Sequence, residues 1–280
     1  MELQKEQNLR NLLESVPHGF FVDSKWLGSQ GISRQLATKY LKSGWLTREA
    51  HGLYRRPVQS SAESAVEIPD WELLVLSMQV LMQYEVHVGG TSALQRRGHG
   101  HYVTMGADER VFLYGDKIPG WLKSVQTNAK FELRNRKLFT KPEIGLDTGM
   151  QPNDGPHAQP PWRWSLTISS PERAILEALN ELPNAESFHN TDMMFQGLVN
   201  LRPRRMMAAL EACTSIQVKR LFFVFADRHE HAWLKHIDET AINLGSGDRS
   251  FVKGGKLHPK YRITVPPEFL PHPREEQNGQ

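Results

Sequence analysis

The sequence is poor in cysteine, with Cys213 as the only one among 280 residues. A single thiol excludes an internal disulfide and a cysteine-based zinc site. There is also no run of about 18 uncharged apolar residues, which a membrane-spanning helix needs. The first residues, MELQKEQNLRNLLESV, are charged and amphipathic and lack the apolar centre of a signal peptide. We therefore expect a cytoplasmic protein with no membrane partner.

Motifs for catalysis and metal binding are equally scarce. No HExxH motif occurs, and the histidines of GHGHY and of RHEHAWLKH have no carboxylate or thiol at ligand spacing. The glycine pair of GGTSAL lacks the spacing of a nucleotide-binding motif, which favours a tight turn over a phosphate cradle. No Ser-His-Asp set or carboxylate pair stands out. We predict that the protein is not an enzyme and has no metal and no cofactor.

What is present is positive charge at one end of the chain. Residues 1–60 contain nine Lys or Arg and five Asp or Glu, a net charge of +4, whereas the remainder has a net charge of −1. The excess positive charge therefore lies in the first fifth of the sequence, where it would attract a polyanion.

The same sixty residues have the pattern of a winged helix–turn–helix. Leucines at helical spacing predict a helix over about 3–15, Asp23 is a candidate N-cap for a second, and Ser33 for a third that ends at Gly44. WLTRE and LYRR then predict two strands around a turn at His51 and Gly52. We assign residues 1–60 to a winged helix–turn–helix domain.

The third helix separates its apolar and polar residues. Leu36, Ala37, Tyr40 and Leu41 share one stripe, so burying that stripe would present the polar residues to a DNA groove. The predicted DNA contacts are Arg34, Gln35, Thr38, Lys39 and Lys42 on the helix, with Arg48, Arg55 and Arg56 on the hairpin. The competing interpretation is an ordinary solvated surface helix.

The remainder predicts a larger mixed α/β domain, so that the fold class is α+β. A linker at 61–69 precedes a domain over 70–266 with a mobile loop at about 142–161, and a disordered tail follows at 267–280. Strands are expected at 110–115, 131–139 and 162–168, and helices from Asp70 to about 83 and near 90–94. Further helices are expected at 171–182, 190–200, 203–213 and 231–241, and a closing hairpin pairs 249–255 with 260–266. The helix over 171–182 would have Ser169 or Ser170 as its N-cap, with Glu172 at capping-box distance from Ser169. Residues 216–226 fit a strand or a helix, with the helix slightly favoured.

The glycine-rich stretch LGSGDRSFVKGGK, residues 244–256, leaves two interpretations open. Arg249, Lys253 and Lys256 could form a basic loop that accepts phosphate. Alternatively, the glycines form hairpin turns and the lysines are solvated.

Several stretches together resemble one family. They are HGLYRRP, HVGGTSALQRRGHGHYV, SSPERAILEAL, VKRLFFVFADRHEHAWLKHID and INLGSGDRSFVKGGKLHPKYRITVP. In number and order they are similar to AbiEi, the antitoxin of the bacterial AbiE abortive-infection system, a type IV toxin–antitoxin pair. The resemblance implies an N-terminal winged helix–turn–helix that represses its own promoter at inverted repeats. It also implies an antitoxin domain that counteracts a nucleotidyltransferase-like toxin without a stable complex.

The best-matching motifs in the C-terminal part contain Lys219, Arg220, Arg249, Lys253 and Lys256, so the resemblance implies these as antitoxin residues. Two other functions compete. A stand-alone transcription regulator would use the C-terminal domain to sense a ligand, and a nuclease would use the N-terminal domain to find its substrate. The absence of a recognisable carboxylate cluster disfavours the nuclease.

Overall fold

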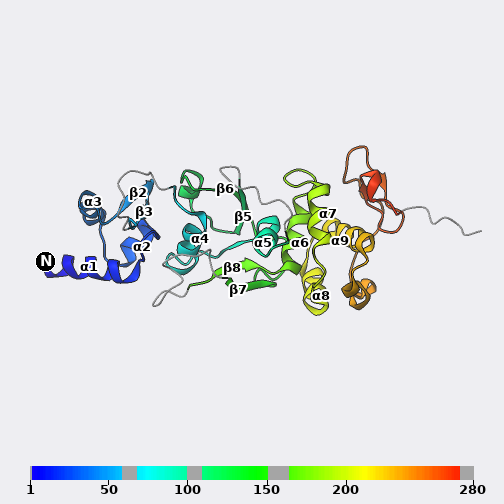
Figure 1. Cartoon of the computed structure of the whole chain (residues 1–280), viewed down its shortest axis with the longest axis horizontal. Helices are drawn as coiled ribbons and strands as arrows, with labels where there is room; N and C mark the ends of the chain where they lie inside the picture. Colours follow the sequence, from blue (N-terminus) through cyan, green and yellow to red (C-terminus); the bar gives the residue numbers. More distant parts are fainter. Residues whose placement is uncertain (1, 59–67, 100–108, 151–163, 272–280) are drawn as a thin grey trace, which may run out of the picture. The chain divides into compact units, whose positions relative to one another are not determined.

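The computed structural model describes residues 2–58, 68–99, 109–150 and 164–271, and it divides the chain into two compact units. Unit 1 contains residues 1–88, 104–136 and 146–168. Unit 2 contains residues 89–103, 137–145 and 169–280. Figure 1 shows the elements of each in sequence colours.

Unit 1 begins with the predicted winged helix–turn–helix. Its elements are α1 (Glu2–Ser15), β1 (Phe21–Asp23), α2 (Ser24–Ser29), α3 (Arg34–Lys42), β2 (Thr47–Ala50) and β3 (Leu53–Arg55). The three strands form an antiparallel sheet in the order β1-β3-β2. The predicted helix order and hairpin are confirmed, with a β-bulge between Arg48 and Ala50.

Caps set the ends of these short helices. A carboxylate oxygen of Asp23 accepts the N–H of Trp26 at 2.8 Å, and the Ser33 hydroxyl accepts the N–H of Leu36 at 3.3 Å. Gly44 has a φ of +72°, the left-handed conformation that ends α3. Both N-caps and the C-terminal glycine are those predicted from the sequence.

The rest of unit 1 is a five-stranded sheet with one long helix. The order is β6-β5-β4-β8-β7, where β4 is antiparallel to β5 and parallel to β8, and β5 is parallel to β6. The strands are β4 (Val86–Val88), β5 (Arg110–Gly115), β6 (Lys130–Arg134), β7 (Leu146–Met150) and β8 (Leu166–Ser169); α4 (Trp71–Val80) and the 3₁₀ helix η1 (Gly120–Lys123) complete the unit.

Two hydrogen bonds, one buried and one half-buried, join the winged helix to α4 and to the turn that follows it. The N–H of Phe21 donates to the Ser77 hydroxyl at 3.0 Å, and the Tyr84 hydroxyl donates to Asp23 at 2.6 Å. The carboxylate of Asp23 thus caps α2 and also links the winged helix to Tyr84.

Three expectations for this region need correction. The strand predicted over 131–139 ends at Arg134, and β8 begins at Leu166 rather than at 162. β7 occupies residues 146–150 of the predicted loop at 142–161, because that segment lies at the sheet edge beside β8. The remainder of that loop, 151–161, falls outside the described residues, as does most of the predicted linker.

Unit 2 is mainly helical. Helix α6 (Pro171–Asn180) packs against α5 (Gly90–Arg96), α7 (Phe188–Gln196), α8 (Pro203–Ala212) and α9 (Ile216–His229). The chain continues through η3 (Ala232–His236), η4 (Glu239–Ala241), β9 (Lys256–Leu257), β10 (Thr264–Val265) and η5 (Pro267–Phe269). The core is aromatic, with Phe195, Phe222 and Phe225 fully buried.

Unit 2 also confirms some expectations and corrects others. Residues 216–226 are helical, and Ser170 is the N-cap of α6. The capping box from Ser169 is wrong, because the Ser169 hydroxyl donates to Glu177 instead. The helix predicted over 231–241 is two short 3₁₀ helices. The hairpin predicted between 249–255 and 260–266 is wrong in its first strand, because the antiparallel pair is β9 with β10 and Arg249 forms only an isolated parallel bridge with Ile263. The tail predicted at 267–280 is wrong at its start, because residues 267–269 form η5 and Phe269 is buried against Phe225. Residues 272–280 fall outside the described residues.

Candidate nucleic-acid interface

Helix α3 presents its polar side chains to solvent. Ala37 and Tyr40 are buried, whereas Leu36 and Leu41 are half-buried. The five predicted contact residues are all exposed: Arg34, Gln35, Thr38, Lys39 and Lys42. The structure therefore brings these five side chains to one outer face of α3, as the pattern predicted. The Thr38 hydroxyl donates to the carbonyl of Arg34 at 2.9 Å, which fixes its orientation.

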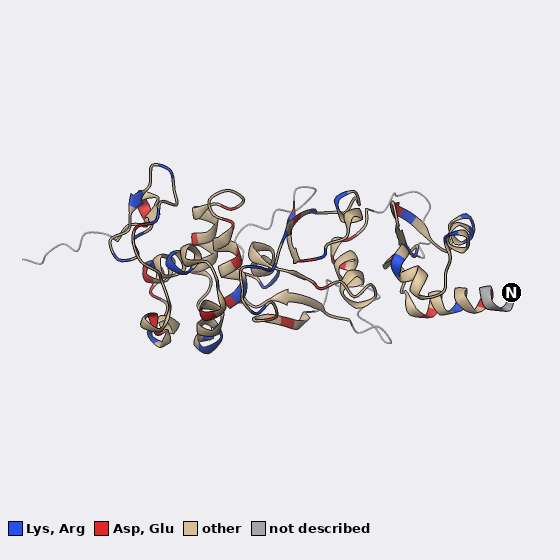
Figure 2. Cartoon of the chain, turned by 180° about the vertical axis from the view of Figure 1, so that it is seen from behind, with Lys and Arg blue, Asp and Glu red and all other residues tan. Residues whose placement is uncertain are grey.

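The charge around α3 is of one sign. Residues 24–48 contain Lys25, Arg34, Lys39, Lys42 and Arg48 and no Asp or Glu. Figure 2 shows Lys and Arg in blue on α3 and on the neighbouring hairpin. Among the described residues, no carboxylate lies within ion-pair distance of Arg34, Lys39 or Lys42. No internal ion pair offsets these three charges, so they can attract an external anion. Lys25, exposed on α2, is a further cation of this stretch that the helical pattern of α3 did not point to. The absence of acidic residues from 24–48 is the sequence signal that could have identified it.

The three arginines of the hairpin differ from one another. Arg48 is exposed, with its guanidinium 6.0 Å from the centre of the Tyr54 ring. Arg55 forms an ion pair of 2.9 Å with Glu49, and the two side chains are only 13 % and 16 % exposed. Of these, Arg48 alone combines exposure with the absence of an ion pair among the described residues.

The guanidinium of Arg56 makes hydrogen bonds within the domain. One guanidinium nitrogen donates to the carbonyls of Leu13 and Val16 at 2.6 and 2.5 Å, and another lies 2.9 Å from the His18 ring nitrogen. Burial lowers the pKa of this guanidinium. The expectation that Arg55 and Arg56 face DNA is therefore revised, because both satisfy groups inside the domain.

The five residues implied for antitoxin activity do not form one surface. Lys219 and Arg220 are buried at 7 % and 3 % exposure. Arg220 donates to the carbonyls of Leu244, Gly247 and Arg262 at 2.7–2.8 Å, so its guanidinium fastens the C-terminal segment to α9. Burial, with the nearby charge of Arg249, lowers its pKa. Arg249 is half-buried, and only Lys253 and Lys256 are exposed.

The glycine pair of GGTSAL lies at the start of α5, where a backbone N–H binds the carboxylate of Glu177. The N–H of Gly90 donates to Glu177 at 2.9 Å, and Arg173 donates to the other oxygen of that carboxylate at 2.6 Å. Both side chains are fully buried. The structural turn favoured by the sequence is thus confirmed. The i,i+4 spacing of Arg173 and Glu177 in the sequence is compatible with this ion pair. Only the structure shows that the pair is buried.

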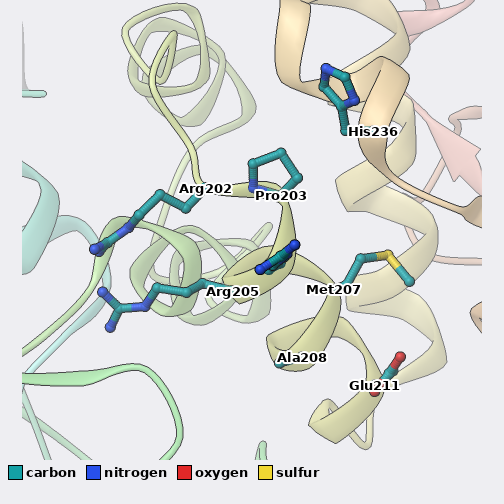
Figure 3. Close-up of a pocket in the computed structure, with 8 residues that line it drawn as sticks. Arg202, Pro203, Arg205, Met207, Ala208, Glu211 and His236 are labelled. Atoms are coloured by element: carbon teal, nitrogen blue, oxygen red, sulfur yellow. The ribbon is translucent and has the colours of Figure 1, made fainter.

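Unit 2 has an open groove of about 820 Å³ along α8, shown in Figure 3. Arg202 and Arg205 extend to the same side, and Met207 and Glu211 lie along the helix. Beneath the arginines, buried Glu172 accepts the N–H and Nε of Arg202 at 3.0 and 3.3 Å. Burial would raise the pKa of Glu172, but these contacts lower it overall. Arg204 also lines the groove, so Glu172 and Glu211 offset two of its three arginine charges, and the groove is less strongly cationic than α3.

The histidines singled out in the sequence make other contacts. His99 lies 3.2 Å from the carbonyl of Gly197, and His229 pairs with Asp192 at 2.7 Å. Across the described ranges, no group of three His, Cys, Asp or Glu side chains is arranged to hold a metal. In those ranges, also, no helix is both long and apolar enough to span a bilayer. His101 lies outside the described residues.

Comparison with known proteins identifies relatives of both halves of the chain. Residues 108–266 match a family model described as "Transcriptional regulator, AbiEi antitoxin, Type IV TA system", and residues 5–105 match the model of the AbiEi antitoxin N-terminal domain. Among solved structures, the RV2827C protein from Mycobacterium tuberculosis has a similar fold, with a TM-score of 0.54 and 14 % identity over 93 % of this chain and 90 % of that one. No curated protein matches.

Proposed function

The chain belongs to the AbiEi family of type IV antitoxin transcriptional regulators, and from this premise we propose what it binds. It represses its own operon by binding inverted repeats in the promoter, and it counteracts a nucleotidyltransferase-like toxin without a stable complex. The protein acts in the cytoplasm and has no enzymatic activity.

One observation carries the DNA-binding proposal: the outer face of α3 is cationic and free of acids, and the hairpin beside it adds exposed Arg48. Arg34 and Gln35, in the first turn of α3, have the donors that read base edges in the major groove. Lys39, Lys42 and Arg48 are suited to phosphates. Two copies on an inverted repeat would add two modest half-site energies, which supplies the specificity of a repressor.

The test is binding of a fluorescent duplex that carries the protein's own promoter, compared with a random duplex of equal length. The variant R34A/K39A should lose promoter binding, because each lost base contact costs about 1–3 kcal/mol and each lost phosphate contact weakens binding to any sequence. R10A is the matched control, since Arg10 is an exposed arginine of α1 paired with Glu14. R10A should bind as the unaltered protein does. Full promoter binding by R34A/K39A would show that α3 is not the recognition helix.

For toxin neutralisation, we propose unit 2, and within it the exposed lysines Lys253 and Lys256 rather than buried Lys219 and Arg220. The experiment is growth after induction of the adjacent gene, alone and together with this protein. The protein should restore growth, and K253A/K256A should restore it less well at equal abundance. Full rescue by that variant would remove the two lysines from the proposal.

The α8 groove supports a second candidate, a stand-alone regulator that senses a ligand, because its volume suits a small molecule. The same growth experiment separates the two candidates. A neighbouring gene that is harmless when induced alone would favour the sensor, whereas rescue of a toxic neighbour would favour the antitoxin.

A further inference from the structure

Trp45 is the most exposed of the tryptophans that the structure describes, at 43 %. It follows Gly44, which ends α3, and precedes Thr47, where strand β2 begins. Its side chain therefore emerges between the recognition helix and the wing. An indole left in water at this point is unusual, because tryptophan is mostly buried on average.

The backbone of Trp45 is hydrogen-bonded within the domain, whereas its side chain makes no hydrogen bond or ring contact among the described residues. The N–H of Trp45 donates to the carbonyl of Tyr40 at 2.9 Å, and the next residue, Leu46, is buried. Within the described ranges, the indole N–H of Trp45 has no hydrogen-bond acceptor and its ring stacks on no other ring. Trp233 shows the contrast, since its indole donates to Leu198 at 2.7 Å inside the core of unit 2.

We propose that Trp45 is a further DNA-contact residue: its ring packs against deoxyribose beside the half-site, and its Nε1–H donates to a phosphate. This inference rests on the proposed DNA-binding function. Tryptophan suits such a place, because it combines a large apolar surface with one hydrogen-bond donor. It would add an apolar contact to an interface otherwise made of charges.

Charge decides between DNA and a second copy of the chain as the occupant. Lys42 and Arg48 flank Trp45 at three residues on either side, within the acid-free stretch 24–48. A two-fold contact between copies would place these like charges against one another, which is unfavourable. A duplex would instead bring phosphates to them.

The experiment measures the affinity of the full chain for the promoter duplex at several salt concentrations. W45A should weaken binding about tenfold and leave the slope of log affinity against log salt unchanged, since no counterion release is lost. K42A should reduce that slope by about 0.9, the value for one phosphate contact. V199A is the matched control, because it shortens an exposed apolar side chain of unit 2, and it should have no effect.

A second measurement reports on the surroundings of Trp45 in the bound state, at duplex concentrations that saturate each protein. Tryptophan emission of the unaltered protein should change on saturation with the promoter duplex, and W45F should lose most of that change. W45F should bind with an affinity between those of the unaltered protein and W45A, because phenylalanine keeps the apolar ring and lacks the N–H donor.

Three results would overturn the inference: unchanged affinity in W45A, an equal emission change in W45F, or a W45A protein that has changed from dimer to monomer in sedimentation. The last result would assign Trp45 to a contact between copies. If R34A/K39A also leaves promoter binding intact, the proposed function itself fails. If R34A/K39A loses binding while W45A keeps it, only the assignment of Trp45 fails.

Discussion

At the scale of single residues, His258 connects folding to pH. It is buried, and its Nδ1 accepts the N–H of Tyr261 at 3.2 Å. Burial lowers the pKa of His258 from its usual value of 6.5; Asp227 acts in the opposite direction and Lys260 in the same direction. Protonation of Nδ1 would remove the acceptor, so the folded state favours the neutral ring.

We therefore expect the free energy of unfolding to fall as pH falls below about 6.5, because the unfolded chain then binds the proton more readily than the folded one. The variant H258N keeps an acceptor oxygen near the position of Nδ1 and removes the titration. Urea unfolding at pH 7 and pH 5 should show a smaller loss of stability in H258N than in the unaltered protein. An equal loss in both would mean that His258 does not contribute to this pH dependence.

The residue scale also shows what a sequence can and cannot predict. The exposure of Arg34, Lys39 and Lys42 followed from helical spacing, because burial of one stripe determines the opposite face. The roles of Arg55 and Arg56 did not follow, since their partners Glu49 and the carbonyls of Leu13 and Val16 are set by how the hairpin meets α1. Local pattern gives exposure of helices better than it gives the partners of hairpin residues.

At the scale of elements, Tyr84 fastens the winged helix to the remainder of unit 1. Its hydroxyl donates to Asp23, and burial together with that carboxylate raises the pKa of Tyr84. Y84F should lower the free energy of unfolding by about 1.5–3 kcal/mol, the range for a hydrogen bond to a charged group. Urea unfolding measures this, and S124A, which loses an exposed hydroxyl and its solvent-exposed bond to the carbonyl of Trp121, should change stability by less than about 0.5 kcal/mol. A similar small change in Y84F would show that the bond to Asp23 contributes little.

Arg220 has the corresponding role in unit 2, where it bonds three carbonyls of the C-terminal segment. R220A should destabilise the fold by at least about 2 kcal/mol, because it removes three hydrogen bonds that a buried, charged guanidinium donates to backbone carbonyls. Amide hydrogen exchange in residues 244–262 should rise most. K253A, an exposed charge nearby, should leave exchange there unchanged. If R220A left both stability and exchange as they were, the segment would have to be held by other contacts.

Elements were predictable where caps and periodicity act locally, and less so where pairing joins distant segments. Asp23, Ser33 and Ser170 mark helix starts in the sequence and in the structure. The sheet order β6-β5-β4-β8-β7 brings together segments separated by up to about eighty residues, which no local pattern encodes. The edge strand β7 was missed because it lies inside a segment whose prolines and glycines predicted a loop, and only its place beside β8 in the sheet makes it a strand.

At the scale of the whole molecule, repression and toxin neutralisation belong to different units in our proposal. Repression is proposed for the cationic face of α3 with Arg48 and Trp45 in unit 1, and neutralisation for unit 2. Each activity should then be removable without the other. Family membership was predictable because the motifs are spread along the chain, and both family models together span residues 5–266.

The most direct test measures both activities in the same cells, with this protein supplied from an unrelated promoter. A reporter follows the protein's own promoter, and growth follows induction of the adjacent gene. We expect R34A/K39A to restore growth as fully as R10A does but no longer to repress the reporter. Repression that persists in R34A/K39A, at an abundance equal to that of R10A, would show that the cationic face of α3 does not carry repression.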